Sequence, residues 1–150
     1  MRVVIQRVLE SSVSIGVSIH SQIENGLLIL LGIETEDGID DADWLISKII
    51  GLRIFSDADD KMNLSIQEIN GSYLVVSQFT LHASTKKGNR PSYIKAARPE
   101  KAVPLYDYFV GKLREKSGKI VRTGIFGADM KVSLINDGPV TIIIDTKNKE

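Results

Sequence analysis

The alternation of apolar and polar positions in the first third of the chain predicts three strands. Arg2 to Leu9 and Ser12 to Ser18 alternate with a period of two, so each is expected to form a half-buried strand, with the turn at Glu10-Ser11. Gly26 to Gly32 is instead a continuous apolar run between glycines. Such a run is typical of a central strand that is covered on both faces.

Further strands are predicted in the remainder of the chain, at Leu52 to Phe55, Ser72 to Thr80, Ile120 to Arg122, Lys131 to Ile135 and Val140 to Asp145. The strand from Ser72 has one face with Tyr73 and Val75 and another with Leu74 and Val76. The last two strands are separated only by 136–139, a cluster of turn formers. That cluster predicts a tight hairpin or corner.

Two helices are predicted from apolar positions that recur with a helical period. The first has Ala42, Leu45, Ile46, Ile49 and Ile50 on one face and is expected to end at Gly51. The second runs from about Glu100 to Lys116, with Ala102, Tyr106, Phe109, Val110 and Leu113 on its apolar face, Pro104 tolerable in a first turn and Gly118 as C-cap. The order of elements predicts an α/β fold of mixed β-sheets in layers, with the two main helices packed outside.

Length and composition indicate an ordinary globular protein. A chain of 150 residues with 43% apolar content predicts a single domain over residues 1–150. The absence of cysteine excludes disulfides, thiolate zinc sites and cysteine nucleophiles. The longest apolar run, Leu27 to Leu31, is too short to span a bilayer, and the N-terminal residues resemble a strand more than a leader. We therefore expect a soluble, cytoplasmic protein that is not associated with a membrane.

Charge is balanced over the whole chain but not along it. The formal net charge of zero argues against nucleic-acid binding by overall electrostatics. Between residues 86 and 101, however, the basic residues Lys86, Lys87, Arg90, Lys95, Arg98 and Lys101 are accompanied by Glu100 as the only acid. Most of them lie in Ala83 to Pro99, which lacks periodicity and is expected to be a long ordered loop. The loop is either a solvated surface or a contact for phosphates.

Widely shared catalytic motifs are missing from the sequence. There is no glycine-rich nucleotide fingerprint, no Walker lysine motif, no His-Glu-x-x-His and no Gly-x-Ser-x-Gly. The histidines, His20 and His82, are too few and too isolated for a recognisable metal site. We therefore expect neither a metal nor a cofactor.

Two segments carry a resemblance to a known family. Residues 75–81 contain SQFTL, at the polar end of a strand, and residues 130–141 contain NDGPVT. Together with MRVVIQRV, LRIF, KMNLS, KGNRPSY and FGADMKV at matching intervals, these segments are similar to the D-aminoacyl-tRNA deacylases, the D-tyrosyl-tRNA deacylase family. The resemblance extends over essentially the whole chain.

The resemblance implies a homodimeric esterase that releases D-amino acids from tRNA, a proofreading step in translation. Ser77, Gln78, Phe79 and Thr80 would then line the pocket for the aminoacyl end and the terminal adenosine, with Phe126 and Met130 as either pocket walls or core. Gly138-Pro139 would be a Gly-cisPro turn that enters the partner's pocket, and Arg7 would help to hold it. Lys86, Lys87 and Arg90 would contact tRNA phosphates.

A Gly-cisPro turn implies chiral selection by the backbone. Two carbonyls that point in nearly the same direction would accept the α-ammonium group of the substrate and crowd the position of an L side chain. Many D-amino acids are then expected as substrates. Glycine has no side chain to clash, so glycyl-tRNA is expected to be at least partly a substrate.

Two mechanisms are open for cleavage of the ester. Thr80 could act as a nucleophile, with His82 as the nearest candidate base. Alternatively, backbone N–H groups near Gln78 to Thr80 would stabilise the oxyanion, the vicinal ribose hydroxyl would activate water, and Thr80 would only position the substrate. The second mechanism is preferred because the sequence offers no convincing base.

Two other functions compete with the proofreading esterase. A non-catalytic RNA-binding module could use the basic loop at Ala83 to Pro99 without any catalytic residue. Against this function, only 6% of the residues are aromatic, which leaves few side chains for base stacking. A different esterase could act on another aminoacyl ester. Deacylation of D-tyrosyl-tRNA beside L-tyrosyl-tRNA would separate the three.

Overall fold

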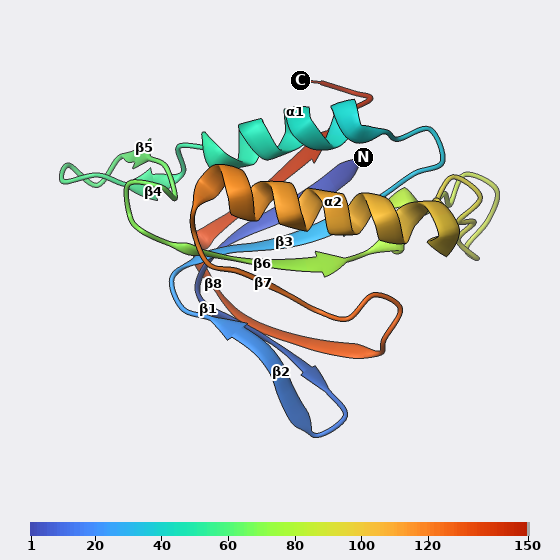
Figure 1. Ribbon diagram of the computed structural model, residues 1–150, viewed down its shortest axis with the longest axis horizontal. Coiled ribbons are helices and arrows are strands. Elements are labelled where there is room, and N and C mark those ends of the chain that lie inside the picture. The colour runs from blue at the N-terminus through green and yellow to red at the C-terminus, as the bar shows by residue number, and fades with distance from the viewer. Residues whose placement is uncertain (150) are drawn as a thin grey trace.

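The computed structural model describes residues 1–149 and contains one large sheet, a small hairpin and two long helices (Figure 1). The strands are β1 (Arg2–Ile15), β2 (Ser18–Ile23), β3 (Gly26–Gly32), β4 (Phe55–Ser56), β5 (Met62–Leu64), β6 (Ser72–Ser77), β7 (Val121–Thr123) and β8 (Met130–Asp145). The helices are α1 (Ile39–Ile50), the short 3₁₀ turn η1 (Phe79–His82) and α2 (Pro99–Ser117). The mixed α/β fold class predicted from the sequence is confirmed.

The large sheet is organised around β3. Its order is β2-β1-β3-β6-β7, and β8 pairs with β1 as well. β3 is antiparallel to β1 and parallel to β6, and β6 is parallel to β7. The apolar run Gly26–Gly32 is buried almost throughout, so the prediction of a central, doubly covered strand is confirmed.

β1 corrects the prediction of two strands with a turn at Glu10-Ser11. The strand continues through these residues to Ile15, with shifts of register against β8 on either side of Val8. The exposed residues at 9 and 10 therefore mark an irregularity in a long strand. The turn comes later, at Gly16, whose φ of 60° is readily adopted by glycine, and leads into β2, which the sequence pattern did not predict.

β8 corrects the prediction of a tight hairpin or corner at residues 136–139. Both halves of β8 are antiparallel to β1, so the chain continues in one direction through the turn formers. Gln6 pairs with Thr141 and Val8 with Asn136, so residues 137–140 lie opposite Arg7 alone. The segment thus bulges out of a continuous strand because β1 holds the strand on both sides of it.

The two long helices cover the same face of the sheet (Figure 1). All five residues predicted for the apolar face of α2 are buried, as are Ala42, Leu45, Ile46 and Ile49 of α1. The helices end as expected, with Gly51 and Gly118 as C-caps. Pro104 lies inside α2 and not in its first turn, because the helix already begins at Pro99.

The sheet buries apolar side chains on both faces. Tyr73 and Val75 of β6 belong to the core beneath the helices, whereas Leu74 and Val76 belong to a smaller core on the opposite face. The predicted separation of the two faces is confirmed. The strand itself ends at Ser77, however, and not at Thr80, because the chain turns into η1.

Smaller differences concern short elements. The predicted strand from Leu52 to Phe55 is reduced to β4, which pairs with β5 around the turn-rich residues 57–60. β7 is displaced by one residue from its predicted position. Residues 83–98 form the expected loop, whose regular pairing is limited to isolated bridges such as Ser84 with Ser92. Within residues 1–149, no helix is both long and apolar enough to cross a membrane.

Candidate active site

Polar residues follow β6 at the edge where the parallel strands β3 and β6 end. Ser77 is the last residue of β6 and pairs with Leu31 near the end of β3. The N–H of Gln78 donates to the carbonyl of Leu31 at 2.8 Å and closes the ladder. Because parallel strands end at a common edge, the crevice beyond that edge is where such folds bind ligands.

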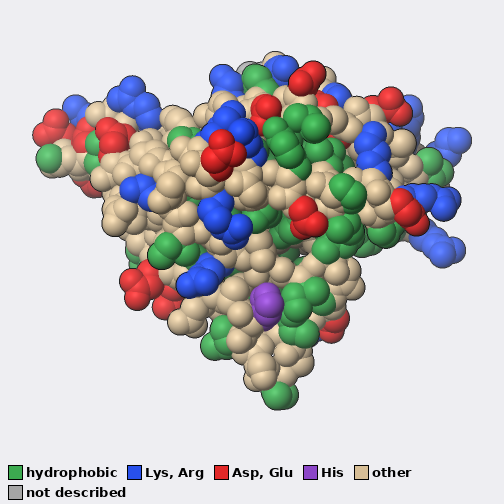
Figure 2. Space-filling view, in the orientation of Figure 1, with side chains coloured by type: hydrophobic (Ala, Val, Ile, Leu, Met, Phe, Trp, Pro, Cys, Tyr) green, Lys and Arg blue, Asp and Glu red, His purple; other side chains and the backbone are tan. Residues whose placement is uncertain are grey.

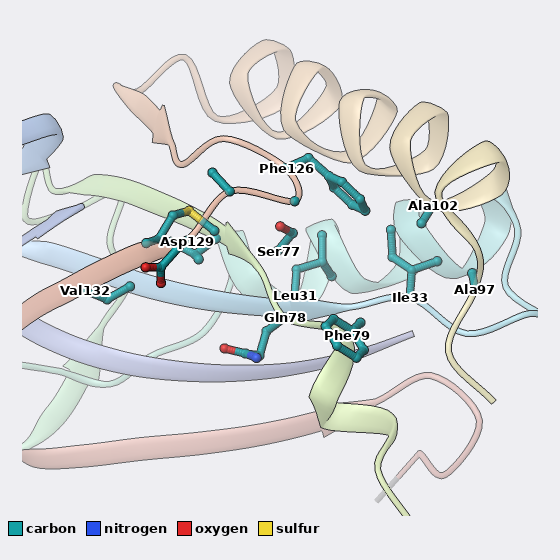
Figure 3. Close-up of a pocket in the computed structure, with 14 residues that line it drawn as sticks. Leu31, Ile33, Ser77, Gln78, Phe79, Ala97, Ala102, Phe126, Asp129 and Val132 are labelled. Atoms are coloured by element: carbon teal, nitrogen blue, oxygen red, sulfur yellow. The ribbon is translucent and has the colours of Figure 1, made fainter. Parts of the chain in front are cut away.

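A cleft of about 320 Å³ opens at this edge (Figure 3). Its walls come from the ends of β3 and β6, from the segment between β7 and β8, and from the start of α2. The lining residues are Leu31, Ile33, Val76, Ser77, Gln78, Phe79, Ala97, Ala102, Phe126, Gly127, Ala128, Asp129, Met130 and Val132. Five of the residues proposed from the sequence thus lie around one cavity: Ser77, Gln78, Phe79, Phe126 and Met130.

The cleft has an apolar end and a polar end. Phe126, Ala102 and Ile33 gather near the start of α2. Gln78 and Asp129 lie toward the other end, where Val132 is beside Asp129, and Ser77 lies between the two groups (Figure 3). Phe126 is supported from behind by Tyr106, at 5.9 Å between ring centroids. The hydroxyl of Tyr106 donates to the carbonyl of Val75 at 2.8 Å, and burial raises the pKa of this phenol. Among residues 1–149, Asp129 is the only ionisable side chain that lines the cleft, and its exposed carboxylate lies 2.9 Å from the ammonium group of Lys131.

The turn η1 places two backbone donors next to the cleft. The N–H of Gln78 is used in the sheet, as described above. Within the described part of the chain, the N–H groups of Phe79 and Thr80 have no hydrogen-bond acceptor, because they begin a 3₁₀ turn. The end of the turn is anchored by Arg2, whose Nη1 donates to the carbonyl of Leu81 at 2.7 Å. Backbone N–H groups without an acceptor can stabilise an oxyanion that forms within their reach.

Thr80 and His82 do not line the cleft. Thr80 is half-buried, and its hydroxyl accepts a hydrogen bond from the side-chain amide of Gln78. The side chain of His82 is buried and borders a separate cavity with Arg2 and Lys95. The structure therefore brings Thr80 beside the site but leaves His82 outside it.

Gly138 and Pro139 lie exposed at the bulge of β8 and do not line the cleft of the same chain. Their peptide bond is cis. Gly138 has a φ of 116°, and a Cβ at this position would lie 2.9 Å from both Nη2 of Arg7 and Cγ2 of Val140. Only glycine therefore fits here without displacing its surroundings.

Arg7 and Asn136 hold the bulge in place. Nε of the buried Arg7 donates to the carbonyl of Asp137 at 3.2 Å and lies 2.9 Å from its carboxylate, while Nη1 donates to the carbonyl of Ile54 at 2.5 Å. Nδ2 of Asn136 donates to the carbonyls of Arg7 and Val140, each at 3.0 Å. The contact between Arg7 and the turn, expected from the resemblance, is present.

Lys86, Lys87 and Arg90 are exposed at the tip of the loop between β6 and α2, and none lines the cleft. Reciprocal backbone hydrogen bonds between Ser84 and Ser92, of 2.8 and 2.9 Å, close the tip. Figure 2 shows Lys and Arg side chains projecting at the end of the molecule where this loop lies.

Sequence reasoning missed most of the apolar lining. Leu31, Ile33, Ala97 and Ala102 come from elements far apart in the sequence, and nothing local distinguishes them from core residues. Asp129 belongs to the FGADMKV stretch, whose resemblance to a family was the one available signal. In residues 1–149, no group of three His, Cys, Asp or Glu side chains is placed to hold a metal ion.

The fold and the cleft together define a mixed α/β protein with a cleft at the carboxyl ends of parallel strands, where such folds commonly bind small ligands. The family model described as D-Tyr-tRNA(Tyr) deacylase matches residues 4–145. The chain is 66% identical to a D-aminoacyl-tRNA deacylase of Flavobacterium psychrophilum and 65% identical to one of Porphyromonas gingivalis, in each case over 150 residues and all of both chains. The chain therefore belongs to the D-Tyr-tRNA(Tyr) deacylase family.

Two solved structures have the same fold. One, described as a c-Myc DNA unwinding element binding protein, superposes with a TM-score of 0.91 at 38% identity and covers 97% of this chain and 98% of its own. The other, described as a probable eukaryotic D-amino acid tRNA deacylase, superposes with a TM-score of 0.81 at 18% identity over 95% and 97% of the two chains. At that identity the second likeness supports the fold alone.

Proposed function

We propose that this chain hydrolyses the ester bond of D-aminoacyl-tRNA and releases a free D-amino acid and tRNA. The observation that carries the proposal is the cleft at Ser77 to Phe79. It has an apolar end, and the backbone N–H groups of Phe79 and Thr80 beside it have no acceptor within residues 1–149. Membership in the deacylase family supplies the substrate class. The apolar end suits an adenine ring, and the end with Gln78 suits the ester group.

Cleavage is assigned to backbone donors and to the substrate itself. Water, activated by the vicinal ribose hydroxyl, attacks the carbonyl carbon, and the N–H groups of Phe79 and Thr80 stabilise the oxyanion. The carbon–oxygen ester bond then breaks, and the ribose oxygen takes the proton. The sequence led us to expect the N–H of Gln78 among the oxyanion donors. We do not include it, because this N–H already donates to the carbonyl of Leu31. Thr80 orients Gln78 through their side-chain hydrogen bond.

Chiral selection is assigned to Gly138 and Pro139 of a partner subunit in a homodimer. The proposal is supported by the position of this segment, which is exposed, firmly held by Arg7 and Asn136, and outside the cleft of its own chain. Its main-chain carbonyls would accept the α-ammonium group, and its backbone would occupy the space that an L side chain needs. Glycyl-tRNA would escape this rejection. Lys86, Lys87 and Arg90 would contact tRNA phosphates.

The test is a deacylation time course with D-tyrosyl-tRNA and L-tyrosyl-tRNA, run beside light scattering to measure the oligomeric state. Cleavage of the D ester alone, by a dimer, is the expected result. Cleavage of both at equal rates would leave a generic esterase, and binding without turnover would leave an RNA-binding module. A monomer that still cleaves only the D ester would contradict the assignment of chiral selection to Gly138 and Pro139 of a partner subunit.

A further inference from the structure

Phe79 combines a chemically sensitive backbone with a weakly confined side chain. Its N–H and that of Thr80 are the proposed oxyanion donors, yet 54% of Phe79 is exposed. Its neighbours are better held, since Gln78 bonds Leu31 in the sheet and the carbonyl of Leu81 accepts from Arg2. Some other contact has to hold the ring of Phe79 if the two donors are to keep one direction.

Tyr93 supplies such a contact. The rings of Phe79 and Tyr93 meet edge to face, with centroids 5.1 Å apart and planes inclined by 71°. This is a favoured geometry for aromatic pairs. Tyr93 does not line the cleft, and its ring reaches the site through Phe79.

The backbone around Tyr93 is fastened on both sides. Before it, Ser92 exchanges two hydrogen bonds with Ser84, as described above. After it, the N–H of Ala97 donates to the carbonyl of Ile33 at 2.9 Å, and the N–H of Thr35 donates to the carbonyl of Lys95 at 3.0 Å. The last two bonds tie the loop to the chain just beyond β3, so the backbone that carries the ring of Tyr93 is held in place.

We propose that Tyr93 is a positioning residue that holds the ring of Phe79 and thereby fixes the oxyanion donors of Phe79 and Thr80. The role rests on the proposed function. Preorganised donors stabilise a transition state more than donors that must be reoriented during the reaction. Loss of the ring contact should therefore lower kcat and leave the binding of substrate nearly unchanged.

The experiment compares Tyr93→Ala, Tyr93→Phe and Ile94→Ala in the full-length protein. Ile94 is adjacent and 89% exposed, so its substitution is the matched control. Each variant is assayed with D-tyrosyl-tRNA and with the D-tyrosyl ester of the trinucleotide CCA, which lacks the acceptor stem. We expect Tyr93→Ala to lower kcat by up to about tenfold on both substrates, with KM within about twofold, and Tyr93→Phe to restore it because the ring pair remains.

A double-mutant cycle with Phe79→Leu tests the contact itself. The pair Tyr93→Ala and Phe79→Leu should cost no more than the worse single variant, because both remove one interaction. Thermal melting of each variant separates loss of positioning from loss of the fold. Additive losses of activity in the cycle would overturn the proposal. It would also be overturned if Tyr93→Ala lowered the melting temperature so far that unfolding explained the lost activity.

Two further outcomes would also overturn the role of Tyr93. A raised KM for tRNA with normal turnover of the trinucleotide ester would make Tyr93 a direct contact for RNA. Equal activity of Tyr93→Ala and the wild type on both substrates would leave Tyr93 without a role. If the wild type cleaves neither ester, the proposed function fails as well. This failure is distinguished from failure of the role of Tyr93 because it is seen in the wild type, before any variant is measured.

Discussion

The cleft at the end of β6 and the bulge in β8 are built in opposite ways. The cleft is concave, and its apolar walls come from several elements that are distant in sequence. The bulge projects from a single strand and is held by polar contacts of Arg7 and Asn136. A concave cleft can enclose a substrate and activate it. A projecting turn can only admit a substrate to a neighbouring site or exclude it. We infer that the division of labour between chemistry and selection follows this difference.

The largest effect is expected from a change in the substrate at the cleft. Replacing the terminal adenosine by 2′-deoxyadenosine removes the hydroxyl that we propose activates water, so deacylation should slow by about a hundredfold or more. Thr80→Ala should retain substantial activity, because the role that we propose for Thr80 is only to orient Gln78 through their side-chain hydrogen bond. Single-turnover rates measure both. The reverse pattern, with an inactive Thr80→Ala and a cleaved deoxy ester, would establish Thr80 as the nucleophile.

A second prediction concerns the bulge. Gly138→Ala places a methyl group 2.9 Å from Arg7 and Val140, at a φ of 116°, so the selector must shift. We expect the ratio of D-tyrosyl to L-tyrosyl turnover to fall by about tenfold, the equivalent of about 1.4 kcal/mol in the relative barriers. Gly88→Ala is the matched control, because Gly88 has a φ of 114° in open space. Equal loss of discrimination in both variants would count against a selector at Gly138.

A third prediction separates exclusion from recognition. If the bulge rejects L substrates by a clash, glycyl-tRNA should be cleaved at a rate within about tenfold of D-tyrosyl-tRNA, because glycine has no side chain to clash and exclusion needs no pocket for a D side chain. L-alanyl-tRNA, which carries the smallest L side chain, is the matched comparison. Measured time courses at one enzyme concentration suffice. Stable glycyl-tRNA under conditions that clear the D-tyrosyl ester would refute rejection by a clash.

The smallest effect is expected from the basic loop, which lies outside both regions. The double variant Lys86→Glu and Lys87→Glu should weaken tRNA binding several-fold at low salt and reduce the slope of log affinity against log salt by about two. The double variant Lys61→Glu and Lys116→Glu, in the turn before β5 and at the far end of α2, is the control with the same change of net charge (Figure 1). Filter binding across a salt series measures the slope. An unchanged slope would leave the loop as an ordinary solvated surface.

The spacing of apolar residues predicted those elements in which neighbouring residues along the chain divide between different faces. Helices α1 and α2 were predicted with their buried faces because apolar residues recur every three or four positions. The two faces of β6 were predicted because neighbouring side chains alternate between separate cores. The polar residues Ser77 and Gln78 could be proposed as site residues because they follow a buried strand and resemble a family motif.

The tertiary structure decided what depends on long-range pairing. Residues 10–11 and 136–139 resemble turns locally, but β1 and β8 pair on both sides of them and carry the strands through. The backbone ladder between residues about 130 positions apart thus outweighs local turn propensity. For the same reason, Leu31, Ala97 and Ala102 become cleft walls only after β3, the loop and α2 have packed together. The sequence by itself determined the helices, the faces of the strands and the family, whereas packing at the end of β6 decided which donors are free and which surfaces form the site.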